Sequence, residues 1–168
     1  MPLLDSQAQS KLTALIENDG RYLDQRKWDE WLDLFAEDSI FWVPTWRNEN
    51  ELTEDPSREV SLIYYEGRRR LQERIWRVRS GNSISSAPLV RTMHAISHVL
   101  IVATDEGAAT GSANWSVHVF DPRSRTQHTF FGFYEYAFVF SGDRWLIAKK
   151  KIKILNDHIP TLVDFYTL

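Results

Sequence analysis

The chain has 168 residues, 43% of them hydrophobic, a formal net charge of −3, seven tryptophans and no cysteine. This length fits a single domain over residues 1–168, which buries roughly 70% of the surface of its unfolded chain. The small negative charge excludes a broad attraction to nucleic acid, and the sequence has no apolar run of about eighteen residues to cross a bilayer. We therefore expect neither nucleic acid nor a membrane as a partner.

The lack of cysteine excludes several kinds of chemistry. No disulfide can form, and no signal-peptide core precedes the first predicted helix, so we expect a cytoplasmic location. A Rieske or ferredoxin cluster, a zinc finger and a cysteine nucleophile all need thiolates. The sequence also lacks a Gly-rich phosphate loop and a Gly-x-Ser-x-Gly elbow. We expect no cofactor and no metal in this chain.

Two helices are predicted at the start of the chain. Ser6-Gln7-Ala8-Gln9 has the form of a capping box, and apolar residues follow at helical spacing as far as Leu23. A shorter helix over 28–35 repeats the one-sided spacing, and its apolar residues are Trp28, Trp31, Leu32 and Phe35.

A short strand is predicted over 39–43, where β-branched and aromatic residues run up to Pro44. Residues 44–60 then form a polar, acidic connection. A third helix follows, which Ser80-Gly81-Asn82 breaks, with Glu66–Arg70 and Glu73–Arg77 spaced as ion pairs on its outer side. Its inner side consists of Leu71, Ile75 and Val78.

Four long strands are predicted between Met93 and Leu155, joined by turns at 105–107, 121–124 and 141–143. Helices that precede a run of successive hairpins are typical of an α+β domain. We expect a curled, mostly antiparallel sheet whose mouth is closed by about three helices.

Two of these strands carry unusual faces. In the third of these strands the aromatic side chains all fall on one face, and Gly132 eases the bend that a curled sheet needs. In the last strand the apolar residues Trp145 and Ile147 are predicted on the same face as a row of lysines, so that face changes from apolar to basic along the strand. This apolar area exceeds what one helix layer readily covers, and a lysine row repels itself unless an anion faces it. The alternative for the lysines is a solvated strand end, as for Arg68-Arg69-Arg70. The candidate subunit-interface residues are Phe130, Tyr134, Tyr136, Phe138, Trp145, Lys149, Lys151 and Lys153.

The histidines do not predict a metal site. His94 and His98 lie four residues apart, which places them on one strand face but about 13 Å from each other. His118 and His128 flank a turn and can approach across the hairpin, without an identifiable carboxylate partner. Histidines on half-buried strands are more often hydrogen-bonded structural residues.

A second constellation combines Asp19, Tyr22 and Asp24 late in the first helix with Asp38. Asp19 lies at the edge of the apolar stripe, where a carboxylate facing a pocket would have a raised pKa and act as a general base. The alternative is a cap or a surface ion pair with Arg21 or Arg26.

Six segments together carry a resemblance to the small (β) subunits of aromatic-ring-hydroxylating oxygenases, with the benzoate/anthranilate type most similar. Other members usually place Asn at the position of His98. The segments are Tyr22 with residues 28–38, then residues 41–44, 59–65, 91–99, 145–151 and 156–160.

The resemblance implies a cone-shaped α+β fold like that of nuclear transport factor 2, scytalone dehydratase and ketosteroid isomerase. It also implies a trimer of αβ pairs with a β trimer. The large α subunit would carry a [2Fe-2S] Rieske cluster and mononuclear Fe(II), a reductase would use NADH, and the β subunit would be structural.

Two functions therefore stand against each other. The first is a non-catalytic assembly subunit of an oxygenase that hydroxylates an aromatic ring, with a carboxylated arene suggested by the branch. The second is a stand-alone isomerase or dehydratase that uses Asp19 or Asp24 with Tyr22 or a histidine in the cone. Fold likeness alone cannot transfer that second activity.

Overall fold

The computed structural model describes residues 4–81 and 88–168. Its helices are α1 (Ser6–Asp24), α2 (Trp28–Leu32), α3 (Arg68–Arg79) and the 3₁₀ helix η2 (Phe165–Thr167). Its strands are β1 (Phe35–Pro44), β2 (Ser61–Glu66), β3 (Arg91–Asp105), β4 (Ala108–Asp121), β5 (Thr126–Ser141) and β6 (Arg144–Ile154). No helix in these two described stretches is long and apolar enough to cross a membrane.

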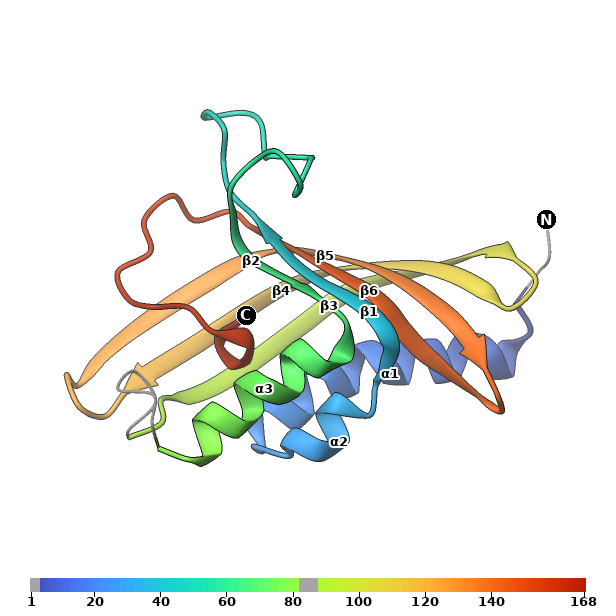
Figure 1. Cartoon of the computed structure of the whole chain (residues 1–168), viewed down its shortest axis with the longest axis horizontal. Coiled ribbons are helices and arrows are strands. Elements are labelled where there is room, and N and C mark those ends of the chain that lie inside the picture. Colours follow the sequence, from blue (N-terminus) through green and yellow to red (C-terminus); the bar gives the residue numbers. More distant parts are fainter. Residues whose placement is uncertain (1–3, 82–87) are drawn as a thin grey trace.

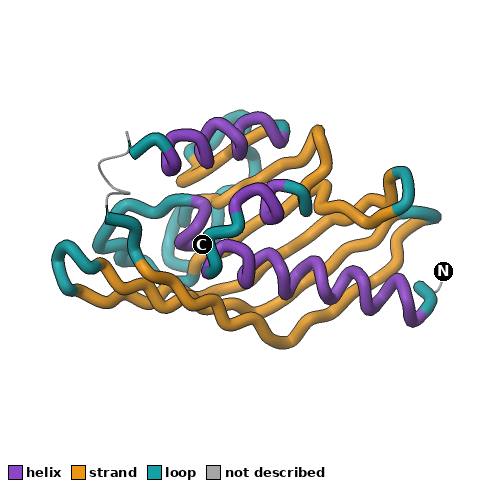
Figure 2. Tube along the Cα trace, turned by 90° about the horizontal axis from the view of Figure 1, so that it is seen from below, coloured by secondary structure: helices purple, strands orange, loops and turns teal. Residues whose placement is uncertain are grey.

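The six strands form one curved sheet in the order β2-β1-β6-β5-β4-β3. Neighbouring strands are antiparallel except for β1 and β6, which are parallel. The helices α1, α2 and α3 lie together on one side of the sheet (Figures 1 and 2). The prediction of an α+β fold with helices against a curled, mostly antiparallel sheet is confirmed, and the three long hairpins occur where their turns indicated.

The first half of the chain contains more strand than the sequence indicated. Phe35 begins β1 instead of ending the second helix, because it pairs with Ile147 and the carbonyl of Leu34 accepts the N–H of Ile147 at 2.8 Å. The strand β2 was not predicted, although Ile63 is buried while Leu62 and Tyr64 are exposed, an alternation typical of a strand. At Phe35, pairing in the sheet has overridden local helix preference.

Two predicted helix details are corrected. The side chain of Asp5, not Ser6, caps α1 by accepting the N–H of Ala8 at 2.6 Å. On α3 the carboxylate of Glu73 pairs with Arg69 and Arg70 at 3.3 Å each, rather than with Arg77. Because the helix begins only after Gly67, Glu66 belongs to β2 and is not spaced as a helical partner.

The core lies between the concave face of the sheet and the helices, and it contains the aromatic residues of β5. Their relative exposure is 3% or less, so the expectation that these four side chains meet other chains is corrected. The chain's own last residues belong to the same core, since Phe165 stacks on Trp31 at 5.0 Å and Leu168 is fully buried. The four β5 residues are Phe130, Tyr134, Tyr136 and Phe138.

A bulge in β6 changes which of its residues face the core. Ile147 pairs with Phe138 and Lys149 pairs with Ala137, so Ala148 is an extra residue between two ladder positions. After the bulge Lys150 turns inward with Ile152 and Ile154, and the row Lys149, Lys151 and Lys153 turns to the convex face. The prediction that one face of this strand changes from apolar to basic is therefore wrong.

Candidate functional site

Asp19 is the centre of a polar cluster inside the core. It follows Leu12 and Ile16 on the buried side of α1, and its side chain is fully buried. Its carboxylate accepts the indole N–H of Trp31 and the hydroxyl of Tyr136, each at 2.7 Å. The alternative of a surface ion pair with Arg21 or Arg26 is wrong, because helical spacing points Asp19 into the sheet.

Lys150 completes this cluster and was missed as an individual residue. Its Nζ lies 2.7 Å from Asp19 Oδ2 and 4.2 Å from the centre of the Tyr134 ring. Burial lowers the pKa of Lys150 and the Asp19 carboxylate opposes that change. Parity counting from Trp145 pointed Lys150 away from the core, because counting cannot register the bulge at Ala148.

The arrangement around Asp19 does not suit a general base. A base needs a free lone pair within hydrogen-bond reach of a substrate. The oxygens of Asp19 already contact Trp31, Tyr136 and Lys150, and all four residues are at most 3% exposed. Burial also raises the pKa of the Tyr136 hydroxyl, which keeps it a neutral hydrogen-bond donor. The cluster is thus a closed structural element of the core.

Asp24 holds a second, separate cluster at the end of α1. Its Oδ1 lies 2.5 Å from His94 Nδ1 and accepts the hydroxyl of Thr92 at 2.9 Å, while its Oδ2 accepts the backbone N–H of His94 at 2.8 Å. The His94 ring therefore directs Nδ1 at the carboxylate, as in an acid–base dyad. The His94 side chain is only 1% exposed and its Nε2 has no hydrogen-bond partner. Asp24 is 22% exposed, and both residues line a hollow of about 390 Å³ at the end of α1, where the Asp24 carboxylate is already occupied by Thr92 and His94.

The remaining members of the predicted constellation are not gathered with these carboxylates. Tyr22 is half-buried, makes no hydrogen bond to Asp19 or Asp24 within the described structure, and places its ring 6.0 Å from Lys27 Nζ. Asp38 is exposed on β1. The structure therefore splits the candidate catalytic set into the buried cluster of Asp19, the partly buried cluster of Asp24, and two unconnected residues.

The histidines are also kept apart. His98 is exposed with φ of +53°, inside a bulge of β3, so it does not share a face with His94. His118 pairs with Thr129 and the next ladder position pairs Val119 with His128, which places His118 and His128 on opposite faces. Among residues 4–81 and 88–168 no group of three His, Asp or Glu side chains is arranged to hold a metal ion. With no cysteine, the donor set does not fit a Rieske cluster or a mononuclear iron, and we assign no chemical step to this chain.

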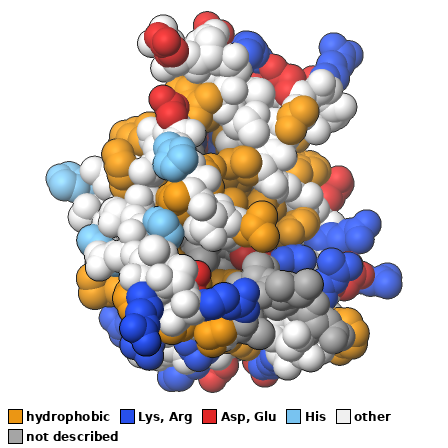
Figure 3. All heavy atoms as spheres, turned by 90° about the vertical axis from the view of Figure 1, so that its left-hand side faces the viewer, with side chains coloured by type: hydrophobic (Ala, Val, Ile, Leu, Met, Phe, Trp, Pro, Cys, Tyr) orange, Lys and Arg blue, Asp and Glu red, His pale blue; other side chains and the backbone are white. Residues whose placement is uncertain are grey.

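One described hollow lies away from both carboxylate clusters. It has a volume of about 470 Å³ and lies between the tail of the chain and the β4–β5 turn, the end of the molecule seen in Figure 3. Asp121, one of its polar residues, already accepts the backbone N–H of Arg123 at 2.8 Å, which lowers the pKa of Asp121. Neither Asp19 nor Asp24 lines it. The residues that do include Val90, Val119, Leu162 and Thr161.

Comparisons with known proteins agree with this picture. The family model described as "Ring hydroxylating beta subunit" matches residues 18–161. The beta subunit of benzoate 1,2-dioxygenase from Acinetobacter baylyi is 34% identical over 164 residues, which cover 98% of this chain and 96% of that subunit. The small subunit of 2-halobenzoate 1,2-dioxygenase from Burkholderia cepacia is 36% identical, with 92% and 93% covered.

A solved structure extends the likeness to the fold. The beta subunit of benzoate 1,2-dioxygenase from Burkholderia mallei superposes with a TM-score of 0.78 at 31% identity, and all of both chains is covered. Beta subunits of such dioxygenases pair with a large oxygenase subunit in a complex, and the cofactors lie in that partner. The chain belongs to the family of ring-hydroxylating beta subunits and is the small subunit of an aromatic-ring dioxygenase.

Proposed function

We propose that this chain is a non-catalytic assembly subunit and that its oxygenase hydroxylates a carboxylated aromatic ring. The observation that carries the proposal is the closed cluster around Asp19, because Trp31, Tyr136 and Lys150 already occupy the buried carboxylate that the alternative isomerase or dehydratase would use as its general base. The substrate class is supported by two relatives, which are named for benzoate and 2-halobenzoate.

The redox groups of the system belong to other chains in this proposal. The large subunit carries a [2Fe-2S] Rieske cluster and mononuclear Fe(II), and a reductase uses NADH. The small subunit forms one domain and joins three αβ pairs in the cytoplasm. The lack of thiolates and the scattered histidines of this chain support that division.

The convex face of the sheet offers a surface for the large subunit. Lys149 Nζ and Lys151 Nζ lie 5.3 and 4.4 Å from the ring centre of Trp42, and neither has an ion pair in the described structure. Lys153 pairs with Glu135 at one end of the row. Two ammonium groups held over an indole suit carboxylates of a partner, which would set register and specificity.

Apolar side chains lie on the same convex face. Phe131 and Phe133 of β5 are 45% and 43% exposed. The even-numbered residues of the same strand, from Phe130 to Phe138, point the other way and are buried. Trp145 does not belong to this face: it shares the parity of the buried Ile147 and packs against Phe140 on the concave side, with ring centres 5.4 Å apart. Aromatic residues beside a basic row are typical of protein interfaces.

Reconstitution with the large subunit tests the proposal. The small subunit should co-purify with it in a fixed ratio, and turnover should require both chains. Two variants should leave turnover within a few-fold: Asp24→Asn, and Asp19→Asn combined with Lys150→Met so that no buried charge is unpaired. A loss of roughly 10²–10⁴ in turnover with assembly intact would instead identify a general base and reject the structural role.

A further inference from the structure

Helix α3 presents an excess of positive charge beside β2. Its twelve residues include six arginines and one glutamate. Arg70, Arg74 and Arg77 recur at helical spacing and face a hollow of about 330 Å³ between α3 and β2, which we call the α3–β2 hollow. Its other lining residues are Tyr64, Tyr65 and Glu73.

The acidic groups near this hollow do not balance its arginines. Glu73 is shared by Arg69 and Arg70, and Asp164 is bound by Arg74. Arg77 has no ion pair in the described structure, and Arg74 Nε is buried without a hydrogen-bond partner. The hollow therefore has the charge to receive carboxylates.

The aromatic neighbours of the hollow suit a protein partner. Trp76 of α3 is 64% exposed and Tyr64 of β2 is 37% exposed. Tryptophan, tyrosine and arginine are the residue types that most often carry the binding energy of protein interfaces.

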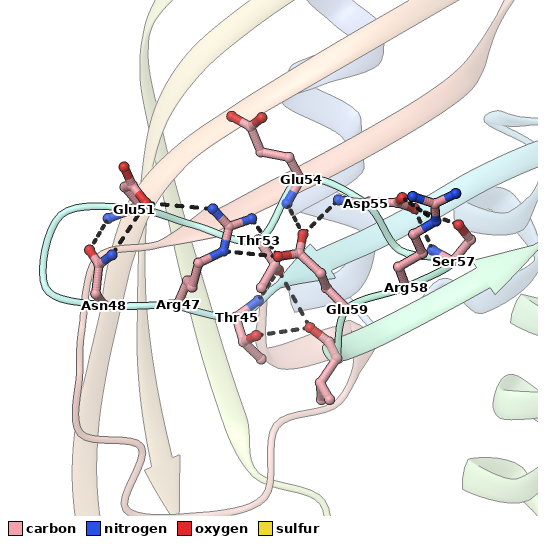
Figure 4. A network of polar contacts seen from close by, with 11 residues as sticks. Thr45, Arg47, Asn48, Glu51, Thr53, Glu54, Asp55, Ser57, Arg58 and Glu59 are labelled. Carbon is pink, nitrogen blue, oxygen red and sulfur yellow. Dashed lines mark hydrogen bonds and ion pairs between the residues drawn. The ribbon is translucent and has the colours of Figure 1, made fainter.

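The connection between β1 and β2 has the opposite charge and projects from the sheet (Figure 1). This segment, residues 45–60, is called the acidic arm because it has five carboxylates against two arginines. Glu59 orders it by accepting the backbone N–H groups of Glu54 and Asp55 at 2.8 and 2.9 Å and by pairing with Arg47 (Figure 4). The indole of Trp46 anchors the arm by donating to the carbonyl of Ile154 at 2.9 Å.

Some carboxylates of the arm are left over from this network. Glu49 and Glu54 have no ion pair in the described structure, and Figure 4 shows the Glu54 side chain pointing away from the other groups. Glu51 is 60% exposed and lies 3.5 Å from Arg47. A surface segment already ordered by its own hydrogen bonds loses little conformational entropy when it binds.

The arm cannot reach the hollow of its own chain. Part of β2 separates them, since Val60 at the end of the arm lies four residues before Tyr64 at the edge of the hollow, about 13 Å at about 3.3 Å per residue. Figure 1 shows the arm and α3 at opposite ends of that strand. Complementary patches at different places on one chain suit a head-to-tail contact between copies, which closes into a ring if the rotation permits.

We propose that the acidic arm of one small subunit docks into the α3–β2 hollow of the next, with Glu49 and Glu54 facing Arg70 and Arg77. This deepens the assembly role proposed above and rests on it. The occupant of the hollow is a second copy of this chain, because both halves of the contact are present on the chain itself.

A charge swap tests the contact by sedimentation of the small subunit at low salt. Glu49→Lys with Glu54→Lys, or Arg70→Glu with Arg77→Glu, should each weaken self-association at least about tenfold. Combining all four substitutions should restore it to within a few-fold of wild type, since the charges then match again. Circular dichroism checks that each variant is folded.

Matched controls change the same number of charges in or next to the hairpin turns. Glu106→Lys with Asp143→Lys, and Arg125→Glu with Arg144→Glu, should leave self-association unchanged. The proposal is overturned if the wild-type chain stays monomeric at the highest attainable concentration, or if the variant with all four substitutions does not regain self-association. It is also overturned if the charge-reversed variants change only in their binding to the large subunit. If the assembly role itself were wrong, the result would be different: the wild-type small subunit would not co-purify with the large subunit.

Discussion

Lys150 Nζ lies 2.7 Å from Asp19 Oδ2, and both side chains are completely buried. An ion pair in such a place has a high desolvation cost, which its attraction and the hydrogen bonds from Trp31 and Tyr136 offset. Removing one partner leaves the other charge without compensation, whereas removing both does not. The pair links α1 to the centre of the sheet, so its loss should affect folding and not a chemical step.

We predict that Lys150→Met lowers the free energy of unfolding by about 3–5 kcal/mol, because Asp19 is then buried without a cation. The double variant Asp19→Leu with Lys150→Met should lose clearly less. Urea denaturation of both variants measures this. Lys149→Met on the convex face is the matched control and should change stability by about 0.5 kcal/mol or less. Equal losses of stability in Lys149→Met and Lys150→Met would contradict the role of the buried ion pair.

We predict that His98→Asn raises stability by a few tenths to about 1 kcal/mol. His98 has φ of +53°, a left-handed conformation in which asparagine is favoured among residues with a side chain. His98→Val should destabilise by about 1–2 kcal/mol, since a β-branched residue is strained there. Thermal melting of the three proteins gives the order, and a valine variant as stable as wild type would refute it.

The acidic arm should lose its order at low pH. Hydrogen bonds from Asp55, Arg47 and Glu54 lower the pKa of Glu59 from 4.5 to about 2. Because the pKa of Glu59 is lower in the folded chain, its ionised carboxylate stabilises the fold at pH values above its ordinary pKa of 4.5. This stabilisation is lost as the pH falls from 4.5 toward 2. Exchange of the Glu54 and Asp55 amide hydrogens should accelerate over this range. Glu59→Gln should remove that pH dependence, and an unchanged profile in the variant would argue against Glu59 as the cause.

Gly132→Ala should be severely destabilising. A Cβ at this position would lie 1.8 Å from the carbonyl oxygen of Lys153, so the backbones of β5 and β6 must separate. We expect a loss of about 3 kcal/mol or more in chemical denaturation, or no folded protein. Gly111→Ala is a fair comparison, because its Cβ would meet the end of the Phe138 ring at 2.8 Å and a ring can rotate away. A milder effect at position 132 than at position 111 would be unexpected.

The parts of the fold that were predictable from sequence are those with long, regular patterns. The turns around Gly107 and Gly142 and the strands between them follow from composition and alternation alone. Bulges are different, because an extra residue is recognisable only when the partner strand is aligned beside it. The bulge at Ala148 therefore reversed the assignment of the lysines, and the bulge at His98 placed His98 on a different face from His94.

The candidate site shows the same division between local and long-range information. Asp19 lies seven residues after Leu12, so its place beside the apolar stripe was visible in the sequence. Its three partners come from α2, β5 and β6, and no local pattern connects them.

The left-handed residue in β3 has a consequence for the subunit before it meets its partners. β3 is a fifteen-residue edge strand and exposes Leu100 and Val102, which makes it a template to which a foreign strand can add. The bulge at His98 interrupts the even spacing of the backbone N–H and C=O groups along the free edge of β3. One of these groups, the N–H of His94, already donates a hydrogen bond to Asp24. A newly made small subunit is thereby guarded against aggregation while it waits for assembly.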